Sequence, residues 1–171
     1  MKKLLLLTGV LLLAFGGAVF AQDDNEFQVW KEMPWSLGGS YEYGTNTRES
    51  FAHGYGISLD RYLFSPFVAA GLRGNMHNDG VSVTATEALF TVRGYAPVTG
   101  NASLFTQLGF GAAFYSEEDR ERNTYTLDLT AGCRVYITRS FLRGFYVEPY
   151  IRAGFPFLFS GGIAVGHWFN F

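Results

Sequence analysis

Apolar and polar residues alternate along most of this chain, and this alternation restricts its fold more than any other feature. In the stretch "TYTLDLTAGCRVYIT", the odd-numbered positions from Tyr125 to Ile137 are apolar or small, and most even-numbered positions are polar or glycine. A period of two places successive side chains on opposite faces of a strand. The same pattern recurs along the chain and predicts eight strands, near residues 35–44, 51–62, 66–76, 81–96, 102–115, 123–138, 144–156 and 160–171.

Turn-forming residues separate the predicted strands. In chain order the connections read "TNTRES", "FSP", "HNDG", "PVTG", "SEEDRERN", "RSFLRG" and "LFSG". Pro149 falls inside the seventh predicted strand, where a proline removes one hydrogen bond of the ladder. Either a bulge accommodates this residue or the seventh strand ends there.

The N-terminus has the features of a secretory signal peptide. Lys2 and Lys3 precede an apolar stretch that runs to about Phe20, and Ala21 follows it, with Val19 two positions before Ala21. This order predicts a signal peptide over residues 1–21, cut between Ala21 and Gln22. The alternative is an uncleaved anchor, because the apolar stretch approaches the ~17-residue lower limit for a spanning helix.

The rest of the chain is long enough for one domain. Of 171 residues, 150 remain after the predicted cut, and 11 of the 13 basic residues then face 15 acidic ones, for a net charge of −4. This charge gives no indication of nucleic-acid binding. Cys133 is the only cysteine, which excludes an intrachain disulfide.

The length of the predicted strands favours a membrane. Many exceed ten residues, whereas strands of soluble proteins usually have ~5–6 and tilted membrane-spanning strands need about 9–11. In lipid every backbone N–H and C=O group needs a partner within the protein, so a sheet spans only when it closes on itself. We therefore expect an all-β fold, an eight-stranded antiparallel transmembrane β-barrel over residues 35–171, preceded by a periplasmic segment over residues 22–34.

The C-terminal stretch "GGIAVGHWFNF" ends on an alternating apolar row. It resembles the C-terminal signature of bacterial outer-membrane β-barrels, and the whole architecture is similar to the OmpX, OmpA-barrel and OmpW-like groups. His167 departs from the signature. The resemblance implies that the outer-membrane assembly machinery recognises this segment, through the matching residues Ile163, Val165, Phe169 and Phe171.

The barrel fold also predicts an orientation. With both termini in the periplasm, the odd-numbered connections face outward, and they are short for the family. Aromatic residues near strand ends predict two interfacial girdles. The outer girdle is Tyr41, Tyr43, Phe51, Phe114, Tyr125 and Phe155, and the inner one is Trp35, Phe145, Phe169 and Phe171.

Nine charged residues fall on the polar faces of the predicted strands. The lumen of an eight-stranded barrel is just wide enough for side chains to fill, and an unpaired ion there costs several kcal/mol. We therefore expect a plugged lumen in which opposite charges pair, with Asp128 and Arg134 facing Glu148 and Arg152 across one hairpin. The predicted network is Glu42, Asp60, Arg73, Glu87, Arg93, Asp128, Arg134, Glu148 and Arg152.

Candidates for catalysis are weak. Ser40 lies in "GGSYE", which is not a nucleophile elbow. His53 and Ser58 differ in parity, His167 lies on the lipid face, and His77 is expected beside Asp79 in the second outer connection. We predict no catalytic residue, no metal site and no cofactor.

These features favour a monomeric outer-membrane barrel with a structural or surface-exposed role and membrane lipids as its surroundings. The first alternative is a narrow channel for small or hydrophobic molecules, as in the OmpW-like group, with an entrance near the apolar run Phe155 to Phe159. The second is a lipid A-modifying enzyme, because some eight-stranded barrels have that activity.

Overall fold

The structure, a computed structural model, describes residues 33–46, 51–78, 83–99, 101–117, 120–137 and 142–170. The predicted signal peptide, most of the expected periplasmic segment and Phe171 lie outside these ranges. The described chain forms eight strands: β1 Trp35–Asn46, β2 Phe51–Tyr62, β3 Val68–Asn78, β4 Val83–Thr99, β5 Ala102–Glu117, β6 Arg120–Tyr136, β7 Phe145–Phe155 and β8 Phe157–Phe169. The prediction of eight strands is therefore confirmed.

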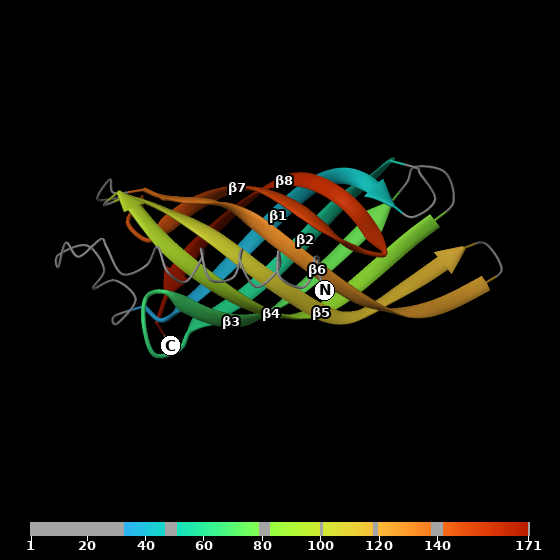
Figure 1. The fold of residues 1–171 in the computed structure, drawn as a ribbon, viewed down its shortest axis with the longest axis horizontal. Helices are drawn as coiled ribbons and strands as arrows, with labels where there is room; N and C mark the ends of the chain where they lie inside the picture. The colour runs from blue at the N-terminus through green and yellow to red at the C-terminus, as the bar shows by residue number, and fades with distance from the viewer. Residues whose placement is uncertain are drawn as a thin grey trace, which may run out of the picture.

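The strands form one closed antiparallel barrel, in which each strand pairs with the next and β8 pairs with β1. The closing register runs from Trp35 opposite Phe169 to Asn46 opposite Phe157, with a shift between Thr45 and Asn46. Figure 1 shows the strands slanting across the barrel. Closure gives both edge strands a partner, which is what a chain that ends on a strand requires.

Alternation along each strand separates an inner from an outer face. In β7, Tyr146, Glu148 and Arg152 are buried in the lumen, whereas Ile151 and Phe155 are exposed on the outer wall. Large apolar side chains are exposed on the outer wall from β1 to β8. The molecule is therefore polar and aromatic inside and apolar outside, the reverse of a soluble domain.

Glycines on the inner face provide space for large neighbours. Gly166 stands opposite Tyr146 and Gly162 opposite Tyr150 in the β7–β8 ladder. A Cβ atom at Gly166 would meet the Tyr146 hydroxyl, and one at Gly162 would lie 2.6 Å from the Tyr150 ring. These tyrosines can therefore cross the lumen only because the facing residue has no side chain.

The β5–β6 hairpin extends beyond the strand that follows it. β6 pairs with β5 up to Arg120 but with β7 only up to Leu127. Figure 1 shows this hairpin projecting at the end of the barrel opposite the C-terminus. The described part of β6 before Leu127 therefore has a ladder partner on one side only.

Several predicted connections were placed wrongly. Thr45 and Asn46 belong to β1, His77 and Asn78 to β3, and residues 97–99 to β4. The expected outer connection "LFSG" lies within β8, and most of "SEEDRERN" lies within β5 and β6, where only residues 118–119 fall outside the described ranges. Serine, glycine and charged residues are typical of turns in a sequence. Here they lie at the ends of strands that extend further than the sequence predicted.

Pro149 does not interrupt β7. It pairs with Ile163 of β8, and the β6–β7 register is the same on both sides of it, from Gly132 opposite Tyr150 to Val135 opposite Val147. The missing N–H group is therefore tolerated without the bulge that the sequence suggested. At the preceding turn, Gly144 has a φ of 94°, a conformation that favours glycine.

In the part of the chain that the structure describes, no helix is long and apolar enough to cross a membrane.

Candidate functional site

Many charged and polar side chains are buried in the lumen of the barrel. Its polar side chains form two clusters along the barrel axis. We call the first the termini-side cluster, because it lies nearer the strand ends that carry Trp35 and Phe169. It consists of Asp60, Arg93, Gln107, Arg134 and Glu148.

Glu148 is the centre of the termini-side cluster. Its carboxylate accepts hydrogen bonds from Arg134 Nε at 2.5 Å and from Arg93 Nη1 at 3.0 Å. Arg93 also donates to Gln107 Oε1 at 2.9 Å and lies 3.6 Å from Asp60. Arg93 is on β4 and Glu148 on β7, so this contact bridges the lumen rather than two neighbouring strands.

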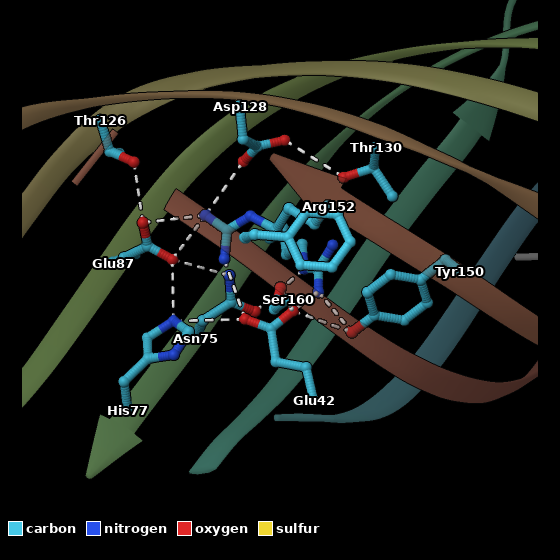
Figure 2. Close-up of polar contacts among 12 residues, drawn as sticks. Glu42, Asn75, His77, Glu87, Thr126, Asp128, Thr130, Tyr150, Arg152 and Ser160 are labelled. Atoms are coloured by element: carbon cyan, nitrogen blue, oxygen red, sulfur yellow. Dashed lines mark hydrogen bonds and ion pairs between the residues drawn. The ribbon is translucent and has the colours of Figure 1, made fainter. Parts of the chain in front are cut away.

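The loop-side cluster lies nearer the other end of the barrel. Figure 2 shows its polar contacts in close-up. Arg152 lies between three carboxylates, at 2.9 Å from Glu42, 2.8 Å from Glu87 and 3.1 Å from Asp128. Uncharged side chains also donate hydrogen bonds to Glu42 and Glu87. The members of the cluster are Glu42, Arg73, Asn75, His77, Glu87, Thr126, Asp128, Tyr150 and Arg152.

His77 closes the loop-side cluster toward the outer connections. Its Nε2 atom lies 3.0 Å from Glu87 and 3.5 Å from Glu42. The ring stacks on Phe157 with 3.8 Å between centroids. The sequence placed His77 in an outer connection, which is wrong: the residue is in β3, is 4% exposed and lies in the lumen.

An aromatic layer lies between the termini-side cluster and the termini. The Arg134 guanidinium lies 3.8 Å from the centroid of the Tyr146 ring and 4.8 Å from that of Tyr95, as in cation–π contacts. Arg134 also donates to the Tyr62 hydroxyl at 2.8 Å. The buried or partly buried rings of this layer are Tyr62, Tyr95, Phe105, Tyr136, Tyr146 and Trp168.

Little space remains between the two clusters. Arg73, Arg93, Glu148 and Tyr150 line a cavity there of about 10 Å³. A single water molecule needs roughly that much. Among the described residues, the space left between the two clusters is therefore no larger than a single water molecule.

All nine charged residues predicted to point inward are buried in the lumen, at 6% exposure or less. The hairpin partners are also as expected, because Arg134 contacts Glu148 and Arg152 contacts Asp128. The uncharged residues of the two clusters and the aromatic layer were not predicted from the sequence. A signal was present, since Tyr146 and Tyr150 share the parity of Glu148 and Arg152.

The other two histidines lie on the outer wall. His53 accepts or donates a hydrogen bond at 2.6 Å with the Tyr41 hydroxyl, and His167 packs against Phe145. Among the described residues, no serine hydroxyl hydrogen-bonds to a histidine ring, and no group of three or more His, Cys, Asp or Glu side chains could hold a metal ion.

Comparison with known proteins identifies the fold. No family model matches the sequence, and no curated protein matches it. Solved structures do match. The N-terminal β-barrel domain of Pseudomonas aeruginosa OprF superposes with a TM-score of 0.56 at 16% identity, over 78% of this chain and 97% of that one. Neisserial surface protein A gives 0.58 at 8% identity, over 80% and 96%.

The chain has the fold of the eight-stranded outer-membrane β-barrels. Identities this low show the shared fold and nothing about activity. The outer membrane enzyme PagL also superposes, with a TM-score of 0.48 at 11% identity, over 78% of this chain and 99% of that one. In a transmembrane barrel of this fold the apolar outer wall faces lipid, and the two clusters lie inside the cylinder that the strands form.

Proposed function

We propose that this protein is a non-conducting outer-membrane barrel with a structural, surface-exposed role. The observation that supports the proposal is the filled lumen: two polar clusters and an aromatic layer occupy it, and the cavity between the clusters is about 10 Å³. Matched charges most simply satisfy one another. A conducting path would have to separate Glu148 from Arg134 and Arg152 from its three carboxylates.

The proposal includes the route to the membrane. The signal peptide over residues 1–21 would direct export and be cut after Ala21. The assembly machinery would then recognise the C-terminal strand, where Ile163 and Val165 are about half exposed on the outer wall. Phe171 lies outside the described residues. The mature barrel would be a monomer surrounded by outer-membrane lipids.

Planar-bilayer conductance tests the plugged lumen. Purified barrel, shown to be folded by its different gel mobility before and after boiling, is added to a lipid bilayer beside a larger porin as a positive control. We expect no discrete current steps from this protein, and steps from the porin. Reproducible steps that depend on protein concentration would contradict the plugged lumen.

The narrow-channel alternative gains no support from the region that suggested it. In the apolar run from Phe155 to Phe159, Phe157 is buried and stacks on His77, whereas Leu158 and Phe159 are exposed on the outer wall. In this arrangement Phe157 covers the His77 ring instead of lining an entrance. The lipid-modifying alternative lacks an arranged nucleophile among the described side chains, and we propose neither alternative.

A further inference from the structure

The outer wall of the barrel is hollowed over β1 to β4. A depression of about 440 Å³ lies there, within the range of about 300–1,000 Å³ typical of small-molecule sites. Its outward-facing lining includes Ile57, Leu59, Leu72, Gly74, Ala88 and Phe90.

The floor of this hollow is low because two of its outward-facing residues are small. Gly74 stands opposite Ile57 on one side and Ala88 on the other. A Cβ atom at Gly74 would meet nothing nearer than 3.9 Å. The space above the floor is therefore open toward the membrane rather than filled by a neighbouring side chain.

The wall of the hollow is a row of larger apolar residues, two positions nearer the termini. Leu59 and Leu72 are partners in the β2–β3 ladder, and Phe90 pairs with Leu72 in the β3–β4 ladder. Leu72 is 62% exposed and Phe90 is 40% exposed. These side chains rise beside the glycine floor and give the hollow its depth.

Polar side chains do not contribute to the hollow. Arg73 borders it through its position in β3, but its side chain is buried in the lumen, where it contacts Asn75, Glu42 and Tyr150. Ser58 also faces inward, since a Cβ atom at Gly38 would lie 3.1 Å from its hydroxyl. The floor backbone is paired in the β2–β3–β4 ladders.

We propose that this hollow binds one acyl chain of a phospholipid. The hollow lies on the membrane face of a closed barrel, where acyl chains are the surrounding medium. Its walls are hydrocarbon and offer no donor or acceptor that would hold a sugar or a phosphate. A concave apolar surface contacts a flexible chain from more than one side, which increases the dispersion attraction over that of the flat wall.

The apolar row that forms the wall of the hollow lies in the half of the barrel nearer the termini. Gly74 is near the middle of β3, and the Leu59–Leu72–Phe90 row is displaced from it toward the strand ends that carry the termini. With the termini in the periplasm, as expected for this fold, that half of the wall meets the inner leaflet. The occupant we assign is therefore a phospholipid chain.

Photo-crosslinking in vesicles tests this site. The folded barrel is placed in phosphatidylethanolamine vesicles that contain a phospholipid with a diazirine in one acyl chain, irradiated, digested and mapped by mass spectrometry. We expect adducts to concentrate on the segments around residues 57–59, 72–74 and 88–90. Adducts spread evenly around the barrel, or the absence of adducts on these three segments, would overturn the proposal.

Variants that fill the hollow provide the second arm. Gly74→Leu, and separately Ala88→Leu, place a bulky side chain on the floor and are expected to lower the local adducts several-fold. Gly161→Leu is the matched control, because a Cβ atom at Gly161 has equally open surroundings, with its nearest neighbour at 3.9 Å, outside the hollow. Unchanged adducts in both filled variants, each verified as folded by gel mobility, would also overturn the proposal.

Discussion

Neutralising Glu148 is the sharpest test of the lumen network. The substitution Glu148→Gln preserves the size of the side chain and removes its charge. Glu148 is 3% exposed and contacts two guanidinium groups, that of Arg134 at 2.5 Å and that of Arg93 at 3.0 Å. Because shape is conserved, a loss of stability would reflect lost charge pairing rather than a new cavity.

The expected loss follows from the charges that remain. Of the described acidic groups, only the Asp60 carboxylate would then remain near Arg93, at 3.6 Å. Arg134 is 0% exposed, so water cannot replace its lost partner. Removing one member of a buried ion pair costs about 3–5 kcal/mol. We expect Glu148→Gln to lower the free energy of unfolding by that amount.

Urea unfolding in lipid vesicles measures this change. Trp168 lies edge-on to Tyr62 in the aromatic layer, with 5.6 Å between ring centroids, so its fluorescence reports on the lumen. The matched variant combines Glu148→Gln with Arg134→Met. It is expected to be more stable than Glu148→Gln alone, because the stranded cation has gone.

Two results would refute this reasoning. One is a Glu148→Gln barrel whose free energy of unfolding lies within about 0.5 kcal/mol of the wild type, the range of ordinary surface substitutions. The other is a double variant whose loss equals the sum of the two single losses, because residues in direct contact are expected to be coupled.

Two further predictions concern packing and assembly. Gly166→Ala places a Cβ atom against the Tyr146 hydroxyl and is expected to lower the free energy of unfolding by about 1–3 kcal/mol, as overpacking does; a urea midpoint equal to that of the wild type would argue against the tight fit. Deleting Phe171 should reduce the fraction of folded, heat-modifiable protein recovered in outer membranes, whereas Phe159→Ala, which trims an exposed aromatic residue of β8, should not; equal recovery of all three proteins would contradict the assembly signal.

Local alternation was sufficient to predict the strands, because a period of two is visible without any partner strand. The ends of the strands were harder to predict. In β8, Leu158 and Phe159 are both exposed, so alternation breaks at the start of the strand. This break accompanies the register shift between Thr45 and Asn46 in β1, a property of the pair that the sequence of β8 alone does not carry.

The inward charges could be predicted from parity, but their grouping could not. Arg93 and Glu148 come from β4 and β7 and meet across the lumen, and Arg152 and Glu87 do the same. Such contacts depend on the stagger of the closed sheet, which sequence parity does not determine. His77 was missed because "HNDG" has turn chemistry, although β3 continues through its first two residues.

The ladder between the first and last strands has a consequence for biogenesis. Trp35, near the beginning of the described chain, pairs with Phe169, near its end. In a nascent chain, one edge of β1 has no partner until the ribosome has completed β8. The barrel can therefore close only after the whole chain has been synthesised, and a product truncated before β8 would have two unpaired strand edges.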